Sequence, residues 1–259
     1  MTQPDIAIHT DKDVLAAAAA ARLVTRLVDL QSSGNVPKLV LTGGGVGIAM
    51  LEQLRRSPAR DAVDWARIEF YWGDERFLPP GDPERNETQA REALLDHVRV
   101  DPSLVYPMGA DLGTGPSGAD EAAAEYADLL RRKARPEDHA PVPMFDIALV
   151  GMGGEGHTLS IFPESPAVYE TERTVVAVHN CPKPPPTRVS LTLPALRNSA
   201  EVWIVTAGEE KAAAVAMALG GAGEVAIPVA GARGRRRTRW LLDRSAASKL
   251  PRDLVPSIG

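Results

Sequence analysis

A histidine that directly follows a glycine-rich segment is the first candidate for chemistry in this sequence. Residues 150–163 read VGMGGEGHTLSIFP, and His157 comes immediately after the glycines. An imidazole has an unperturbed pKa of about 6.5, so at neutral pH it can take up and return a proton as a general base. A structural histidine in a loop explains the same residue, and the surrounding sequence leaves both interpretations open.

The glycines before His157 also have the spacing of a dinucleotide-binding turn, GxGxxG over residues 151–156. Such a turn opens a full-length helix, and the strand that follows ends near an acidic residue that binds the ribose. Here Pro163 stops any helix soon after His157. The strand expected at 174–178 is not followed by an acidic residue. The pattern therefore indicates a loop that positions His157 rather than a nucleotide site.

A second glycine-rich segment, TGGGVG at 42–47, joins an expected strand to an expected helix. Gly43, Gly44 and Gly45 have no side chains, so their backbone amides can approach an anion, and the N-terminus of a helix favours one. The segment is not a P-loop, because no Gly-Lys-Ser/Thr follows. A tight turn between strand and helix is the alternative. Three consecutive glycines favour a phosphate-binding or substrate-binding role.

Charged side chains follow another expected strand, in the segment GDER at 73–76. Asp74 can orient or deprotonate a reacting group, and Arg76 can pair with a phosphate or a carboxylate. The alternative for this segment is an ion-pair cluster on the surface. Arg188, near the start of a strand, and Lys211, near the start of a helix, are further candidates for binding an anion.

These candidates need a scaffold, and the pattern of apolar residues predicts one. Strands are expected at 5–9, 38–42, 68–72, 145–150, 174–178, 188–192, 201–207 and 239–243. Helices are expected at 12–31, 48–56, 86–98, 119–134, 208–220 and 245–250. Their alternation predicts an α/β fold with a mostly parallel twisted sheet and helices on both faces, Rossmann-like, in a single domain over residues 1–259. In such sheets ligands bind outside the carboxyl ends of the strands, so the post-strand residues above are the ones to examine.

Composition excludes several other classes of function. The net charge of −5, from 29 basic and 34 acidic residues, argues against nucleic acid as the main partner. The arginine-rich run at 233–239 is short and leads into a strand, so we expect a solvated edge or a local anion contact there. Cys181 is the single cysteine, so no intrachain disulfide forms, and its proline-rich surroundings do not favour a reactive thiol.

Other features bear on cofactors and location. The five histidines show no metal-ligand spacing, so we expect no metal and no cofactor. The sequence has no secretory signal and no apolar stretch long enough to cross a membrane. We expect a cytoplasmic protein without a membrane partner.

Taken together, these segments resemble the 6-phosphogluconolactonases, part of a wider family that includes the glucosamine-6-phosphate deaminases. The resemblance runs over nearly the whole chain. GDER and the longer motif GxGxxGHTxSxFP are specific to the lactonase branch, and the deaminases typically have tyrosine where Arg76 stands. The matching segments, in order, are LVLTGGG at 39–45, WGDERFLPPGDPERNE at 72–87, DIALVGMGGEGHTLSIFP at 146–163, RVSLT at 188–192, GEEKAAAV at 208–215 and WLLDRSAA at 240–247.

The resemblance implies a metal-free ester hydrolase that converts 6-phospho-D-glucono-1,5-lactone to 6-phosphogluconate in the oxidative pentose phosphate pathway. It implies that His157 activates water and that Asp74 orients His157 or the substrate. Arg76, Arg188 and Lys211 would hold the substrate, mainly its phosphate, and the glycines at 43–45 would line the same site. We expect a monomer whose partner is this small sugar-phosphate lactone.

The sequence departs from the family pattern at two places. Glu155 stands where the family commonly has aspartate, which leaves a catalytic role for Glu155 in doubt. Gly45-Val46-Gly47 replaces a frequent Ser-Thr-Pro, so this loop can bind only through its backbone. Two other functions stay open: a glucosamine-6-phosphate deaminase or isomerase, and a non-catalytic sugar-phosphate-binding module like the effector domains of some transcription regulators.

Overall fold

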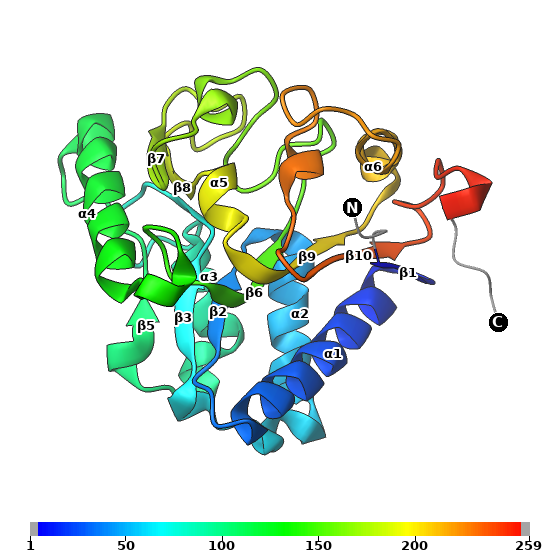
Figure 1. Cartoon of the computed structure of the whole chain (residues 1–259), viewed down its shortest axis with the longest axis horizontal. Coiled ribbons are helices and arrows are strands. Elements are labelled where there is room, and N and C mark those ends of the chain that lie inside the picture. Colours follow the sequence, from blue (N-terminus) through cyan, green and yellow to red (C-terminus); the bar gives the residue numbers. More distant parts are fainter. Residues whose placement is uncertain (1–4, 255–259) are drawn as a thin grey trace.

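A seven-stranded parallel sheet forms the centre of the computed structural model, which describes residues 5–254 (Figure 1). Its strand order is β1-β10-β9-β6-β2-β3-β5. The predicted mostly parallel sheet is therefore confirmed, while residues 1–4 and 255–259 of the predicted domain lie outside the described residues. The strands are β1 (Asp5–His9), β2 (Lys38–Leu41), β3 (Glu69–Trp72), β5 (Val105–Tyr106), β6 (Phe145–Val150), β9 (Ser199–Thr206) and β10 (Arg237–Asp243).

A second, antiparallel sheet is the main feature that the sequence did not predict. Its strands are β4 (Asp74–Arg76), β8 (Arg188–Leu191) and β7 (Val175–Val178), in the order β4-β8-β7. The GDER segment was expected only to follow a strand, but three of its residues form a strand that pairs with β8. Short apolar runs predict strands without saying which sheet they join, because the pairing depends on contacts between distant segments.

Helices cover the large sheet, and their bounds are α1 (Lys12–Ser32), α2 (Gly44–Arg56), α3 (Asn86–Ala93), α4 (Gly118–Lys133), α5 (Leu193–Leu196) and α6 (Ala212–Leu219). Helix α1 packs against α2 and α2 against α3, while α4 packs against β7 and β8. With right-handed crossovers, the strand order places α1 to α3 on one face, and α4 to α6 with the small sheet on the other. Within residues 5–254, no helix has the length and apolar character needed to cross a bilayer.

Several expected helix boundaries were wrong. Helix α2 begins at Gly44 rather than at residue 48, so the glycine segment is the first turn of the helix. The helix expected at 86–98 ends at Ala93, because Leu94 leaves the helical conformation with φ −145°. The short helix expected at 245–250 is a series of turns. Propensity predicts helix interiors better than ends, which depend on local hydrogen bonds.

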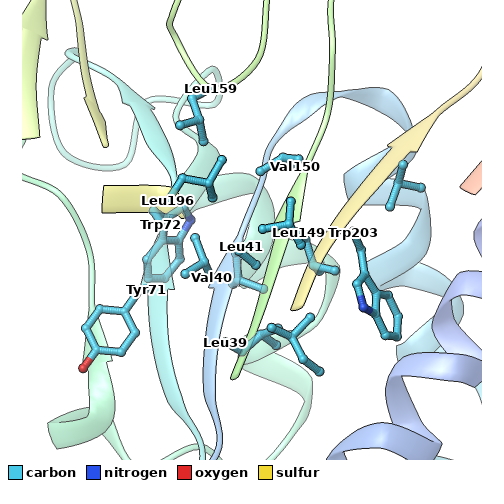
Figure 2. Packing of buried hydrophobic residues seen from close by; sticks show 14 of the residues in the cluster. Leu39, Val40, Leu41, Tyr71, Trp72, Leu149, Val150, Leu159, Leu196 and Trp203 are labelled. Carbon is cyan, nitrogen blue, oxygen red and sulfur yellow. The ribbon is translucent and has the colours of Figure 1, made fainter. Parts of the chain in front are cut away.

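Buried apolar side chains pack the central strands against the rest of the core (Figure 2). This packing holds the carboxyl ends of the strands in place. Leu39, Val40 and Leu41 of β2 are at most 1% exposed, and Trp72 and Trp203 are equally buried. Burying one such side chain stabilises a fold by about 1.5–3 kcal/mol. The loops that leave the carboxyl ends of β2, β3 and β6 therefore start from rigid positions.

Candidate active site

A cleft of about 480 Å³ lies at the carboxyl ends of the parallel strands. This is the edge at which ligands were expected. Every residue predicted for the site lines this one cleft: His157, Asp74, Gly43, Gly44, Gly45, Arg76, Arg188 and Lys211. The structure thus brings together residues from both sheets that are far apart in the sequence.

The first turn of α2 presents backbone amides to the cleft. Gly43 is the N-cap of this helix, and no side chain caps it. The amides of the first helical turn have no partners within the helix, so they are available to an anion or to a carbonyl oxygen. The ammonium group of Lys12, at the start of α1, lies beside Gly45 and adds positive charge to the same corner.

Gly43 allows a close contact that links the two sheets. A Cβ atom at this position would overlap the side chain of Asn86, the first residue of α3. The Asn86 amide donates to the backbone oxygen of Asp74 at 2.8 Å. Its Oδ1 is buried and has no hydrogen-bond partner among the described residues, although Asn86 lines the cleft. Asn86 therefore packs between the N-cap of α2 and the backbone of β4.

Asp74 is a buried carboxylate that its neighbours hold in place. Only 6% of the residue is exposed. Its Oδ2 accepts a hydrogen bond of 2.7 Å from Ser160, which follows His157 in the loop after β6. Pairing of Asp74 with Ser190 in β8 fixes the backbone. Asp74 therefore has a defined orientation at the wall of the cleft.

Arg76 and Arg188 lie directly opposite each other in the β4–β8 pair. Like charges in this position destabilise a sheet unless an anion compensates them. Arg76 donates from Nη1 to the Glu84 carbonyl at 2.6 Å, and its Nε is buried without a hydrogen-bond partner in the described part of the chain. Arg188 donates from Nε and Nη2 to carbonyls of the loop that precedes it. Two arginines thus create a positive wall.

Lys211 contributes the third predicted cation of the site. It ends a short 3₁₀ turn, Glu209–Lys211, directly before α6. Its Nζ lies 3.6 Å from a carboxylate oxygen of Glu210, a long contact for an ion pair. The cleft therefore has positive groups on both its β8 side and its α6 side.

His157 lies in the loop after β6, at the carboxyl edge of the large sheet, and its ring is largely buried. Its side chain is 15% exposed, and its ring packs on Phe162 with 4.4 Å between the ring centroids. A Cβ on Gly153 would overlap this ring, so glycine is required there. The Gly153 amide donates to the backbone oxygen of His157 at 2.9 Å. The glycines of the loop thus fold the chain tightly around the imidazole.

Glu155 fixes the orientation of this imidazole. Its Oε1 lies 2.8 Å from Nδ1 of His157, and its Oε2 accepts a 2.8 Å hydrogen bond from Lys183. Burial alone would raise the pKa of Glu155, but hydrogen bonds from Lys183, the backbone and His157 lower it to about 2. The ionised carboxylate requires the hydrogen on Nδ1, which leaves the lone pair of a neutral ring on Nε2.

The pKa of His157 is lowered below its ordinary value. Burial is the largest cause, and the positive charge of Lys183 acts in the same direction. The negative charges of Glu155 and Asp74 act in the opposite direction. The ring is therefore neutral at physiological pH and can accept a proton.

Glu75, the other acid of GDER, has a structural role. It is fully buried, and its carboxylate accepts from the amides of Arg76, Asn86 and Glu87. Arg85 lies 3.6 Å away as its ion-pair partner. Burial raises the pKa of Glu75 to about 7, against the opposing effect of Arg85 and these amides. This carboxylate ties the start of α3 to β4.

Sequence reasoning missed several residues that line or support the cleft. Thr42 and Asp243 lie at the carboxyl ends of β2 and β10 and line it. The rule that singled out the other post-strand residues would have found them. Asn86 was not among the predicted site residues. No sequence pattern pointed to Lys12 or Lys183, because a local pattern does not show which distant loop a single lysine contacts.

The arginine-rich run at 233–239 and Cys181, two further features of the sequence, lie outside the cleft. In the arginine-rich run, Arg235 donates to the Asp138 carbonyl and to Asn198, and Arg239 pairs with Asp5 at 3.0 Å. Cys181 is buried, and burial raises the pKa of its thiol. Over residues 5–254, no cluster of three or more His, Cys, Asp or Glu side chains has the arrangement of a metal site.

Comparison with known proteins gives matches along most of the chain. A family model for glucosamine-6-phosphate isomerases/6-phosphogluconolactonase matches residues 10–240. A 6-phosphogluconolactonase of Streptomyces coelicolor is 58% identical over 253 residues, which cover 98% of this chain and 97% of that protein. A 6-phosphogluconolactonase of Mycobacterium tuberculosis is 50% identical over 246 residues, which cover 95% of this chain and 98% of that protein.

Solved structures agree with these matches. The 6-phosphogluconolactonase of Trypanosoma brucei has a TM-score of 0.84 at 26% identity, covering 97% of this chain and 100% of its own. A monomeric glucosamine-6-phosphate deaminase is 19% identical and has a TM-score of 0.76, over 95% of this chain and 99% of its own. The deaminase shares the fold, and at this identity the likeness extends no further.

Proposed function

The chain belongs to the family of glucosamine-6-phosphate isomerases and 6-phosphogluconolactonases, and we propose that it hydrolyses 6-phospho-D-glucono-1,5-lactone to 6-phospho-D-gluconate. It is a carboxylic ester hydrolase of the oxidative pentose phosphate pathway. The observation that carries the proposal is the pairing of His157 with an ionised carboxylate inside a cleft lined by Arg76, Arg188 and Lys211. A base beside a group of cations suits an ester that bears a phosphate.

The chemical step needs one base and one set of hydrogen-bond donors. A δ-lactone is an activated ester, so water can attack C1 without a covalent enzyme intermediate. Nε2 of His157 takes a proton from this water, and the imidazolium then returns a proton to the ring oxygen that leaves C1. Glu155 stabilises the imidazolium between these two steps. No proton is gained or lost by the enzyme over the cycle.

The oxyanion that develops at C1 needs preorganised donors. The uncapped amides in the first turn of α2 are suitable, because backbone donors need no rearrangement when charge develops. Asp74, held by Ser160, orients the attacking water or a substrate hydroxyl.

The phosphate of the substrate is bound by the cations. Arg76 and Arg188 face each other across β4 and β8, and a phosphate dianion between them offsets their mutual repulsion. Lys211 neutralises the phosphate from the α6 side. Because the phosphate is remote from C1, its binding energy serves to position the lactone for attack.

A coupled assay tests the reaction. Freshly generated lactone is mixed with the protein, NADP and purified 6-phosphogluconate dehydrogenase, beside an enzyme-free blank that measures spontaneous hydrolysis. We expect NADPH to form faster than in the blank, in proportion to the protein added. A rate equal to the blank at every protein concentration would refute the proposal.

The same preparation tests the alternatives. Because the family includes glucosamine-6-phosphate isomerases, ammonia release from glucosamine 6-phosphate is measured in parallel, and none is expected with Arg76 in place of the deaminases' tyrosine. A non-catalytic sugar-phosphate module would bind 6-phosphogluconate in calorimetry without turnover of the lactone. We infer further that the enzyme is a cytoplasmic monomer, for which light scattering on the purified protein would give a mass of 27.6 kDa.

A further inference from the structure

Lys183 makes a contact that none of the proposed steps uses. It lies in the proline-rich loop 181–187, and its Nζ donates to Oε2 of Glu155 at 2.8 Å. The other oxygen of the same carboxylate accepts from His157. Glu155 is thus held between a permanent cation and the imidazole. The three side chains form a continuous chain from the surface to the catalytic base.

The loop that carries Lys183 is fixed at its base by Arg188. The guanidinium of Arg188 donates to the carbonyls of Lys183, Pro184 and Pro185, each at 3.2 Å. A backbone hydrogen bond from Cys181 to Pro186 closes the loop. An exposed lysine on a mobile backbone contributes little to an ion pair, because ordering its side chain costs entropy. Here the backbone of the lysine is anchored, so only its side chain has to be ordered for the ion pair to form.

From these contacts we propose that Lys183 is a positioning residue for the catalytic base, acting through Glu155, and that Arg188 holds the loop from which Lys183 acts. The inference rests on the proposed function only for its kinetic consequences. Lys183 itself does not line the cleft, so it is not expected to contact the lactone. Lys183 holds Glu155 on Nδ1 of His157, and its positive charge offsets part of the effect of the carboxylate on the imidazole.

The charges around His157 explain why such a residue is useful. Glu155 and Asp74 both favour the protonated imidazole, which cannot accept a proton from water. Lys183 opposes them while leaving the hydrogen bond from Nδ1 to Glu155 intact. The other charged groups that line the cleft with His157 are Lys12 of α1, Arg76 of β4, Arg188 of β8, Glu210 and Lys211 before α6, and Asp243 of β10. None of them contacts Glu155.

Heteronuclear NMR of the histidine rings tests this inference directly. Ring signals are followed against pH in the wild type, K183M and K183R, and the His157 signal is identified by its loss in H157N. In K183M we expect the midpoint of the His157 titration to rise by about half a pH unit, as removal of one nearby, partly screened positive charge predicts. K183R keeps the charge and should titrate like the wild type. Lys249 is exposed and outside the cleft, so K249M is the matched control.

Kinetics then separate positioning from substrate binding. In K183M the acid limb of kcat/KM should move upward with the NMR midpoint, while KM stays within about twofold of the wild type. An unchanged His157 titration in K183M would overturn the inference, as would a large rise in KM without a shift of the acid limb. If the wild type does not hydrolyse the lactone, the proposed function fails, but the ring titration still decides the role of Lys183.

Discussion

The large parallel sheet supplies the cleft with backbone groups, His157 and Lys211 through the segments that follow its strands, whereas the small antiparallel sheet supplies charged side chains directly from its strands. The loops after β2 and β6 contain most of the glycines of the site. Asp74, Arg76 and Arg188 belong to β4 and β8. The catalytic base and the two arginines that bind the phosphate therefore depend on different parts of the fold.

The difference follows from the geometry of the two sheets. Parallel strands end at a common edge, and helices start directly after them, so amides and loops converge on one point. Antiparallel pairing places side chains opposite each other at fixed distances, as for Arg76 and Arg188. We expect changes at His157 and its loop to affect kcat and changes at Arg76 and Arg188 to affect KM.

Replacing the base has the largest expected effect. His157→Asn keeps a polar side chain of similar size but removes the proton acceptor. We expect kcat/KM to fall by about 10²- to 10⁴-fold, the usual contribution of general-base catalysis, with most of the loss in kcat. The coupled assay measures the loss, and an unchanged melting temperature shows that the fold is intact. Wild-type kcat in this variant would remove His157 from the mechanism.

Removing one arginine of the positive wall comes next. Arg76→Met retains the aliphatic part of the side chain but loses the charge, so we expect KM to rise by about 10- to 100-fold, as loss of a charge-assisted hydrogen bond predicts. The effect on kcat should be small. Arg188→Met should differ, because it also releases the loop that holds Lys183. A fall in kcat with unchanged KM in Arg76→Met would break the division between the two sheets.

The contact between the two regions is tested by a pair of glycine substitutions. In Gly43→Ala the new methyl group meets the buried side chain of Asn86, which holds the backbone of Asp74. Overpacking costs roughly 1–3 kcal/mol, so we expect kcat/KM to fall by about tenfold or more. In Gly45→Ala the methyl group meets only the flexible end of Lys12, and the loss should stay below about twofold. Equal losses would mean that Asn86 does not link the sheets.

Sequence alone was sufficient for the large sheet and for the predicted site residues, all of which line the cleft. Strands with buried faces give strong apolar runs, and the strand-end rule leads directly to Gly43, Asp74 and His157. The second sheet was missed because its short strands have no period that distinguishes them from the larger sheet. The start of α2 was missed because glycine is a poor helix former.

Contacts between distant loops were beyond prediction for a different reason. The partner of Glu155 comes from the loop 181–187, and the partner of Asp74 is Ser160. Each pairing depends on how two loops pack in three dimensions, which no local pattern encodes. The doubt about Glu155 arose from its longer side chain, but the structure places its carboxylate on Nδ1 of His157. Its catalytic contribution stays a prediction.

The pH dependence of the wild type is the smallest of the expected effects, and it tests the environment of His157. The active form needs a neutral His157, and the pKa of this ring is lowered. The acid limb of kcat/KM in the wild type should therefore have its midpoint below about 6.5, and activity should persist as the pH falls through that value. Profiles from mildly acidic to neutral pH, each corrected with its own blank, measure the midpoint.

The Glu155→Gln variant shows whether the charge of Glu155 raises the pKa of His157. The amide is nearly the same size as the carboxylate but carries no charge, so the imidazolium loses the group that favours it, and the positive charge of Lys183 loses its partner. Both changes lower the pKa of His157, and we expect the acid limb to move down by about one pH unit. The plateau rate should fall as well, because the imidazolium formed in the reaction is less stable. An upward shift of the limb would mean that Glu155 does not act on His157 through its charge. Burial and the charges of Lys183 and Asp74 would then set the pKa of the base.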